Sequence, residues 1–226
     1  MKNKTILVIV AHPDDETIGM GGTIALHSEK GDDVFCLSLC DGVSARDNHT
    51  DDQLKIRNKA AQTTADRLKF KWLKSPNFKD NCLDAISLIS VIKSIEKIKE
   101  KIKPDIIYTH SQADLNIDHR IVNQATLTAF RPQSNELCSE IRLMEVSSAT
   151  DYSFGKINGL FEPNLFISIK DVWDLKLKAL ESYSMEMRDY PHTRSYDGIK
   201  NLAKYRGNQV GLDMAEAFEI VRKIKR

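Results

Sequence analysis

The stretch Thr5-Ile-Leu-Val-Ile-Val10, followed at once by Ala11-His12-Pro13-Asp14-Asp15-Glu16, decides the fold expected of this 226-residue chain. The residues of the first segment are almost all β-branched or leucine and do not alternate with polar ones. This pattern is typical of a strand buried on both faces of a parallel sheet. The second segment is polar and begins where the strand runs out. Because open α/β sheets bind ligands at the carboxyl ends of strands, a binding site is expected there.

Helix and strand patterns alternate outward from this opening. Residues 19–30 predict a helix and residues 34–39 a second buried strand. The order strand, helix, strand predicts a right-handed crossover and an α/β fold, a Rossmann-like three-layer sandwich with a mostly parallel central sheet. No repeat, low-complexity segment or linker divides the chain, so residues 1–226 are interpreted as a single domain. Further helices are predicted over 54–68, 83–102, 119–130, 172–187 and 197–205, and further strands over 70–73, 105–109, 142–149 and 165–169.

Composition and charge narrow the class of protein. Hydrophobic residues make up 41% of the chain and charged residues 29%, as in ordinary soluble globular proteins. The 33 basic and 32 acidic side chains nearly cancel, which gives no support for a nucleic-acid partner or a membrane-binding patch. No run approaches the roughly 18 apolar residues of a membrane span, and the N-terminus lacks a signal-peptide pattern, so a cytoplasmic protein is expected. The oligomeric state is not readable from the sequence, and a homo-oligomer is compatible with it.

The cysteines do not predict a metal site of their own. The chain has four, which are too scattered for a zinc-ribbon pair. Cys36 and Cys40 belong to a strongly apolar region and are interpreted as small core residues.

The first polar segment has the composition of a metal site. The imidazole of His12 and the carboxylate of Asp15, three residues apart in a turn stiffened by Pro13, can point at one cation. Asp14 and Asp15 project in different directions from consecutive positions, so one can bind metal while its neighbour addresses a metal-bound water. The alternative is a helix N-terminus, which acidic residues favour through capping and the helix dipole. That alternative does not account for His12 or for three carboxylates crowded into one turn, which is costly unless a cation is present.

A second polar segment, Asp114-Leu-Asn-Ile-Asp-His-Arg120, follows the strand predicted over 105–109. Both segments therefore emerge at the same edge of the predicted sheet. Together they supply two histidines and one carboxylate, with a fourth position left open. This is the ligand pattern of a catalytic zinc site.

The two segments together resemble the PIG-L (LmbE-like) deacetylase family, and the closing residues 206–218 look like that family's C-terminal segment. The resemblance implies one zinc ion per chain, or another divalent metal, held by His12, Asp15 and His119. It also implies that Asp14 is the general base. The expected reaction is hydrolysis of the N-acetyl group of an amino sugar or sugar conjugate, which releases acetate and a free amine.

One position departs from the family pattern. Asn116 stands where many members have a histidine three positions before the last metal ligand. Its amide can stabilise an oxyanion but cannot transfer a proton at neutral pH. Either another group is the acid, for which His192 and His110 are candidates, or Asp14 performs both proton transfers. Asp118 is expected to orient the neighbouring histidine ligand or another neighbour.

The substrate is less well determined by the sequence. Arg57 matches a family arginine that contacts substrate, and Arg194 can bind a phosphate or carboxylate group through its guanidinium. His110 is a further candidate for substrate contact. The absence of a long basic or hydrophobic extension favours a soluble sugar, a nucleotide-sugar or a sugar–thiol conjugate. Residues 44–50 and 154–163 are expected to form the rim of the site.

Three other functions are weighed against this interpretation. A metal-dependent hydrolase of another bond, such as a phosphoester, needs more ligands than can be assigned if it uses two metals. A non-catalytic ligand-binding domain of the same fold remains an alternative, although the expected base and ligands are present. A dinucleotide-binding domain is discounted, because the glycines of Gly19-Met-Gly-Gly22 do not follow the first strand directly.

Overall fold

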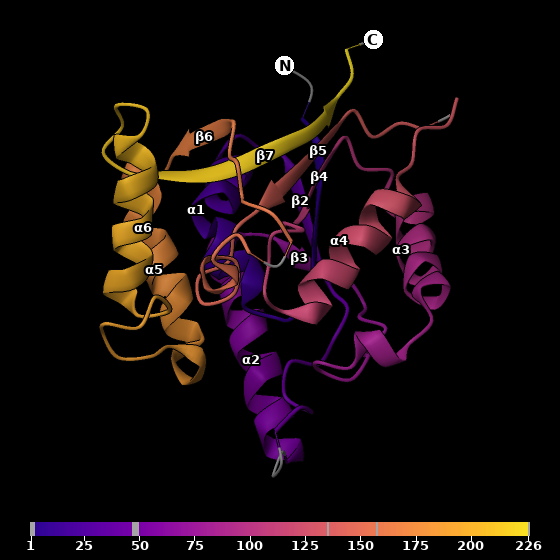
Figure 1. Cartoon of the computed structure of the whole chain (residues 1–226), viewed down its shortest axis with the longest axis horizontal. Helices are drawn as coiled ribbons and strands as arrows, with labels where there is room; N and C mark the ends of the chain where they lie inside the picture. The colour runs from indigo at the N-terminus through magenta and orange to yellow at the C-terminus, as the bar shows by residue number, and fades with distance from the viewer. Residues whose placement is uncertain (1–2, 47–49, 135, 157, 226) are drawn as a thin grey trace.

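The structure, a computed structural model, describes residues 3–46, 50–134, 136–156 and 158–225. They form three layers, with a mixed sheet between two layers of helices (Figure 1), which confirms the predicted α/β sandwich. The strands are β1 (Thr5–Val10), β2 (Asp33–Ser38), β3 (Lys71–Trp72), β4 (Ile106–His110), β5 (Glu140–Met144), β6 (Leu165–Ser168) and β7 (Ala215–Lys223). The helices are α1 (Asp15–Glu29), α2 (Asp51–Leu68), α3 (Leu88–Ile102), α4 (Ile117–Ala129), α5 (Trp173–Ser182) and α6 (Tyr196–Asn208).

The order of strands explains where a site can form. The sheet runs β3-β2-β1-β4-β5-β7-β6, and among the described strands the antiparallel pairs are those of β7 with β5 and of β7 with β6. β1 pairs in parallel with β2 on one side and with β4 on the other. The chain therefore builds outward from β1 to β3 and then returns to add β4 on the opposite side. Such a reversal leaves a crevice at the carboxyl ends of the two central strands, where open α/β sheets bind ligands.

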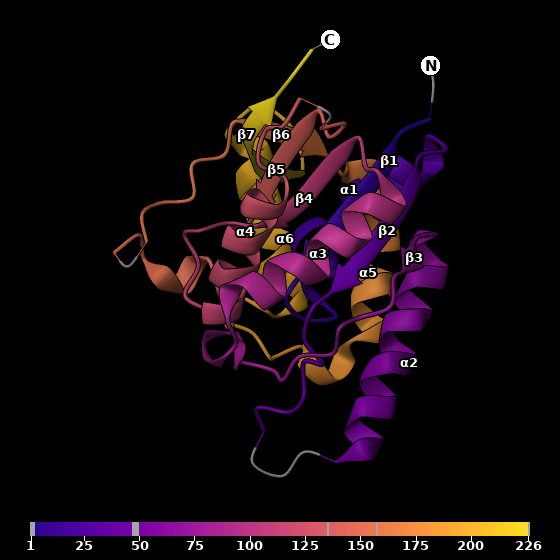
Figure 2. The ribbon, with the colours of Figure 1, turned by 90° about the vertical axis from the view of Figure 1, so that its right-hand side faces the viewer.

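Two hydrophobic clusters hold the layers together, one on each face of the sheet. Ile6 and Val8 pack with residues of α1, α2, α5 and α6, whereas Leu7 and Ile9 pack with residues of α3 and α4. Figure 2 shows α3 and α4 in front of the sheet. All four β1 side chains have 0% exposure, which confirms the predicted strand buried on both faces. Within the described ranges, no helix combines the length and apolar character needed to cross a membrane.

Helix α1 is broken at Met20, whose backbone (φ −149°, ψ 24°) is not helical. A break leaves backbone N–H groups without partners in the turn that follows it. Glu216, on β7, satisfies two of them: its carboxylate accepts the N–H of Gly22 at 2.9 Å and of Thr23 at 2.7 Å. The C-terminal strand thus caps the second half of the first helix.

Lys176, on α5, completes the arrangement on the other side of the break. Its Nζ donates to the carbonyl of Ile18 at 2.9 Å and pairs with Oε1 of Glu216 at 2.7 Å. The close approach explains why a glycine occupies position 22, because a Cβ on Gly22 would lie 2.6 Å from Cγ2 of Ile169. The N-terminal turns of α1 are therefore anchored to the C-terminal part of the chain.

The strand predicted over residues 142–149 is wrong beyond Met144. The chain turns there, because Ser148 adopts a left-handed φ of 67° and the hydroxyl of Thr150 accepts the N–H of Val146. The following loop is thereby directed back toward the carboxyl end of β4, where the N–H of Leu115 donates to the carbonyl of Ala149 at 3.2 Å.

Two predicted helices are shorter than expected, and one strand was not predicted. The helix expected over 83–102 begins at Leu88, after a separate 3-10 turn at Leu83–Ala85. The helix expected over 172–187 ends at Ser182. β7 had no assignment, although it lies between β5 and β6. Its antiparallel pairing depends on neighbours that the local sequence does not specify.

Candidate metal centre and active site

Three side chains from the two polar segments converge beside the carboxyl ends of β1 and β4. His12 lies just after β1, Asp15 is the first residue of α1, and His119 lies in the first turn of α4. Asp15 Oδ2 lies 3.3 Å from His12 Nδ1 and 3.3 Å from His119 Nε2. The three residues are buried, and one ligand atom of each lies within 4.8 Å of the others. The structure thus brings together the residues that the resemblance implies as metal ligands.

The charges around this cluster favour a cation. Burial by itself would raise the pKa of Asp15, but His119 and His12 hold that pKa well below its usual range. Burial by itself would lower the pKa of His119, but Asp15 and Asp114 raise it to about 9. The buried carboxylates of Asp15 and Asp114 therefore favour a positive charge on the groups beside them. A divalent ion supplies that charge and leaves both imidazoles neutral, so the donor set fits a metal.

Each histidine of the cluster has a carboxylate at its far ring nitrogen. His119 Nδ1 lies 3.0 Å from Asp114 Oδ2. His12 Nε2 lies 3.2 Å from Asp118 Oδ2 and 2.9 Å from Asp80 Oδ1. If the far nitrogens carry the protons, His12 Nδ1 and His119 Nε2 are unprotonated. The lone pairs of these two atoms then face Asp15 Oδ2. Asp118 was expected to orient either His119 or another neighbour. In the structure its carboxylate contacts the ring of His12.

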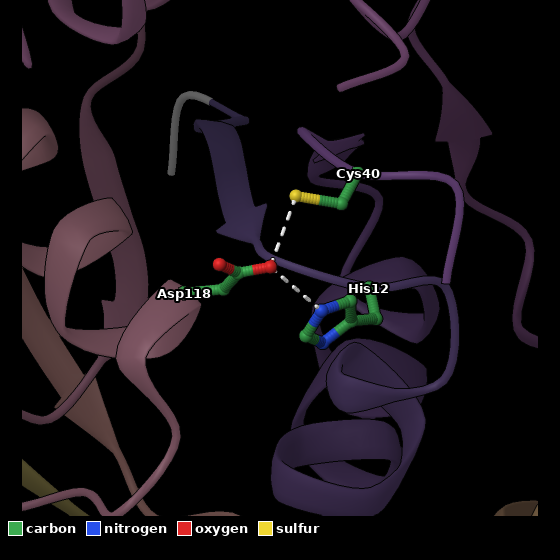
Figure 3. A group of neighbouring side chains, drawn as sticks. All are labelled: His12, Cys40 and Asp118. Atoms are coloured by element: carbon green, nitrogen blue, oxygen red, sulfur yellow. Dashed lines mark hydrogen bonds and ion pairs between the residues drawn. The ribbon is translucent and has the colours of Figure 1, made fainter. Parts of the chain in front are cut away.

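An alternative ligand set surrounds the far nitrogen of His12, and Figure 3 shows it with Cys40 and Asp118. Cys40 Sγ donates to Asp118 Oδ2 at 3.4 Å, and the carboxylate also accepts the N–H groups of Asn81 and Leu83 at 2.8 and 3.0 Å. The carboxylate is therefore well supplied with donors. Burial and the neighbouring Asp118 raise the pKa of Cys40, in keeping with a thiol that donates its proton to this carboxylate. This donor set suits a group that orients His12 better than a second metal site.

Asp14 lies beside the ligand cluster and pairs with arginines. Its Oδ2 lies 3.3 Å from Arg57 Nη1 and 3.7 Å from Arg194 Nη1. The backbone of Asp14 has a φ of 148°, which is strained for a residue other than glycine, and its N–H donates to Glu16 Oε2 at 2.9 Å. Burial raises the pKa of Asp14, and Arg57 opposes that shift. A buried, strained carboxylate with perturbed acidity is typical of a functional site.

Arg57 is enclosed by the protein, with its side chain 6% exposed. Besides Asp14, it contacts Glu186, whose Oε1 lies 3.0 Å from Nη1, and it donates from Nη2 to the carbonyl of Gly42 at 3.2 Å. The guanidinium thus holds Asp14 in position. The predicted contact of Arg57 with substrate stays a prediction.

Three other predicted residues are hydrogen-bonded to their neighbours. Asn116 caps α4, since its side chain accepts the N–H of Asp118 at 2.8 Å. His192 Nδ1 accepts the N–H of Arg194 at 3.0 Å, and Arg194 Nε donates to Ser148 Oγ at 2.9 Å. Catalytic roles for Asn116 and His192, and a substrate contact for Arg194, stay predictions.

His110, the last residue of β4, is fully buried against the cluster. Its ring stacks on that of His119, with centroids 3.8 Å apart, and its Nε2 accepts the N–H of Ala11 at 2.8 Å. The proton of the ring is therefore on Nδ1, and burial lowers the pKa of His110 to about 3. A neutral, enclosed imidazole suits packing beneath a ligand, and contact with substrate stays a prediction.

Sequence reasoning did not select three residues that the structure places at the site: Asp80, Asp114 and Glu186. Asp114 stands inside the second polar segment, and its position five residues before His119 was an available signal. Asp80 lies in a loop and Glu186 in the 3-10 turn Ser184–Glu186, and only the folded chain brings them to His12 and Arg57.

Fold and site together define an α/β protein with a buried histidine–carboxylate cluster at the switch point of its sheet. The family model of PIG-L, described as GlcNAc-PI de-N-acetylase, matches residues 7–130. The chain belongs to this family, which confirms the resemblance.

Proteins named as deacetylases are among the relatives. The diacetylchitobiose deacetylase of Thermococcus kodakarensis is 26% identical over 230 residues, which cover 96% of this chain and 83% of the relative. A probable N-acetyl-alpha-D-glucosaminyl L-malate deacetylase 2 of Bacillus cereus is 25% identical over 185 residues, which cover 79% of this chain and 81% of the relative. These relatives are N-acetyl sugar deacetylases by name, with different sugar conjugates.

Solved structures show the same fold. The N,N'-diacetylchitobiose deacetylase of Pyrococcus horikoshii superposes with a TM-score of 0.78 at 24% identity, covering 97% of this chain and 84% of that one. The 4-carboxy-2-hydroxymuconate hydratase of Pseudomonas putida superposes with a TM-score of 0.74 at 20% identity, covering 99% and 98%. Since a hydratase shares the fold, the fold alone does not identify the reaction.

Proposed function

We propose that this protein is a metal-dependent N-deacetylase that hydrolyses the N-acetyl group of an amino sugar or a sugar conjugate. The metal is proposed to be one zinc ion per chain, and the whole chain of 226 residues is taken to act as one domain. The observation that carries the proposal is the convergence of His12, Asp15 and His119 within 4.8 Å beside Asp14. Three protein ligands and a free carboxylate are the parts that a catalytic zinc site needs.

The side chains present suit these roles. His12 Nδ1, Asp15 Oδ2 and His119 Nε2 would hold the ion, which when bound supplies a Lewis acid for the acetamide carbonyl. Asp114 and Asp118 keep the two imidazoles in the tautomers that this requires.

Asp14 is proposed to remove the proton of the attacking water, since it is the carboxylate next to the ligands and pairs with arginines. As the acetyl group departs as acetate, the leaving nitrogen needs a proton. Asn116 cannot supply it, and His110 is neutral and enclosed. We propose that Asp14 performs both proton transfers, with His192 as the other candidate for the acid.

The substrate class rests on the relatives. By their names, the relatives from Bacillus cereus and Thermococcus kodakarensis act on N-acetylated glucosamine units joined to a second group, which is malate in the first and another sugar in the second. A soluble N-acetylglucosamine conjugate is proposed for this chain. The location is proposed to be cytoplasmic, in line with the sequence prediction.

Acetate release tests the proposal directly. The purified chain is incubated with N-acetylglucosamine, N,N'-diacetylchitobiose and N-acetylglucosaminyl malate, before and after chelation and after zinc is restored. The expected result is acetate and amine in equal amounts from at least one conjugate, lost with chelator and recovered with zinc. No acetate from any of them with the metal bound, or equal rates with and without chelator, contradicts the proposal.

A hydrolase of another bond or a hydratase is the second candidate, because the fold accommodates a hydratase. The same site residues would then act on a substrate without an acetamide. Acetate release from an N-acetyl sugar that depends on Asp14 separates the two.

A further inference from the structure

Asp14 occupies the position that caps α1, but its side chain does not act as a cap. Its carbonyl accepts the N–H groups of Thr17 at 3.0 Å and Ile18 at 2.9 Å, which begins the helix. An aspartate at this position ordinarily has an extended backbone, and its side chain accepts an N–H of the first turn. The carboxylate of Asp14 accepts no such N–H, and the backbone has a φ of 148° and a ψ of −27°. The carboxylate contacts Arg57 Nη1 instead, at 3.3 Å.

This backbone conformation is unfavourable for a residue that carries a Cβ, and it persists only where the surrounding structure holds it. Without that support, Asp14 would relax to the ordinary conformation of a helix cap, and its carboxylate would turn to the N–H groups at the start of α1. A carboxylate turned to the helix is not available to an attacking water. The role proposed for Asp14 therefore depends on contacts that hold its backbone.

Glu16 makes the side-chain contact with this backbone. It is 0% exposed, and its Oε2 accepts the N–H of Asp14 at 2.9 Å. Its Oε1 accepts the hydroxyl of Thr17 at 2.6 Å and the hydroxyl of Tyr183 at 3.0 Å. These hydrogen-bond partners are all neutral donors. Glu16 is therefore held in place by hydrogen bonds from a peptide group and two hydroxyls.

Tyr183 connects Glu16 to a second helix. It directly follows α5 and is 2% exposed. Its hydroxyl bonds to Glu16, and the guanidinium carbon of Arg57 lies 5.9 Å from the centre of its ring. Farther along α5, Lys176 bonds to the carbonyl of Ile18. The end of α5 is thus fixed to the start of α1 at two points, and Tyr183 contacts both residues that support Asp14.

We propose that Glu16 and Tyr183 are positioning residues for the base. They hold Asp14 in the backbone conformation that keeps its carboxylate away from the cap of α1 and available to the attacking water. Their role rests on the proposed function, in which Asp14 is the general base. Neither residue is assigned a contact with the substrate or the metal, so both act through Asp14.

Tyr183→Phe removes the hydroxyl and keeps the ring. The expected result is a kcat for acetate release that is about 2- to 10-fold lower, in the range of one hydrogen bond, with KM and zinc content unchanged. Tyr108→Phe is the matched control, because Tyr108 is 0% exposed and its hydroxyl bonds to His27 Nε2 at 2.9 Å, away from Asp14. Its kcat should equal that of the unchanged protein. An unchanged kcat in Tyr183→Phe, or equal losses in the two variants, overturns the role of Tyr183.

Glu16→Leu removes both acceptor oxygens. It should lower kcat by at least about tenfold and by no more than the loss of the base itself, about 10² to 10⁴. Glu16→Gln should recover most of the activity, because an amide oxygen can accept the N–H of Asp14 while the amide nitrogen donates to the two hydroxyls. A Glu16→Gln variant as impaired as Glu16→Leu would show that hydrogen bonding is not what Glu16 supplies.

A double-mutant cycle with Asp14→Asn tests whether Glu16 acts through Asp14. Once the base is gone, adding Glu16→Leu should lower the residual kcat by less than about twofold, because the two residues serve one function. Losses that multiply would place the effect of Glu16 elsewhere and overturn the proposal. If circular dichroism shows that Glu16→Leu is unfolded, Tyr183→Phe combined with Thr17→Val takes its place, since this pair removes both hydroxyls that donate to Glu16.

The crystal structure of the same variant gives a readout that is independent of activity. A negative φ is expected at Asp14, with its carboxylate accepting an N–H from the first turn of α1. A φ that stays near 148° overturns the proposal. If Asp14→Asn keeps full activity, the proposed base is wrong, and the crystal structure still decides whether Glu16 holds the backbone of Asp14.

Discussion

Lys176 Nζ and Glu216 Oε1 lie 2.7 Å apart, with side chains 3% and 4% exposed, at the break in α1. The pair joins α5 and β7 to the backbone on both sides of the break. It therefore supports the turn of α1 that carries Asp15, one of the proposed metal ligands.

Replacing Lys176 with Met should lower the free energy of unfolding by about 3–5 kcal/mol, because it leaves the carboxylate of Glu216 buried without its partner. Urea unfolding measures this. Lys55→Met is the matched control, since its pair with Asp52 is 76% and 81% exposed and should contribute little. Equal effects of the two changes would show that the buried pair does not hold the helix break.

Asp14→Asn should reduce kcat/KM for acetate release by about 10² to 10⁴, the usual contribution of a general base. Zinc content should stay near that of the unchanged protein, because Asp14 pairs with Arg57 and is not assigned as a ligand. Metal analysis of the purified variant checks this. If zinc and activity are lost together, Asp14 has been misassigned as the base.

His119→Ala should lose the stabilisation that zinc confers. Binding to the folded state alone adds about 2.7 kcal/mol when the free ion is at one hundred times its dissociation constant. Thermal unfolding with and without zinc measures it, with Asp14→Asn as the variant that should retain the effect. Full zinc stabilisation in His119→Ala would remove that residue from the ligand set.

Cys40→Ser should leave zinc affinity unchanged, because the thiol donates to Asp118 and is assigned to the support of His12. Cys36→Ser, at another fully buried thiol, controls for the general cost of the replacement. Competition with a chromogenic chelator measures the affinity. A large loss confined to Cys40→Ser would place the metal in the alternative ligand set of Figure 3.

Stability should fall as the pH is lowered, in part through His27. Burial lowers the pKa of this residue below its ordinary value of 6.5, although its bond to Asp32 opposes the shift. A depressed folded-state pKa contributes stability that is present above the unfolded pKa and is lost as the pH falls through the folded one. The free energy of unfolding should therefore decline below about pH 6.5, and the decline should be smaller in His27→Gln. An identical decline in the variant would show that His27 is not responsible.

Much of the fold followed from local sequence. The apolar run of β1 predicted a strand buried on both faces, and the helix predicted over 83–102 ends at Ile102 as expected. Errors arose where local pattern and tertiary contact disagree. The strand predicted over residues 142–149 ends at Met144, because the chain turns at Ser148. β7 was not predicted, because its position in the sheet depends on pairing with β5 and β6.

By itself the sequence determined the edge of the sheet on which the polar segments would meet. Because β1 and β4 are parallel neighbours, the segments that follow them begin at the same edge of the sheet. This brings His12, Asp15 and His119 together. The tertiary structure alone decided which side chains surround them. Asp80, Glu186 and Glu216 reach His12, Arg57 and the break in α1 through contacts between distant parts of the chain, which the local sequence of neither segment specifies. These carboxylates reach their partners His12, Arg57 and Lys176 only after the helices have packed against the sheet and buried the partners.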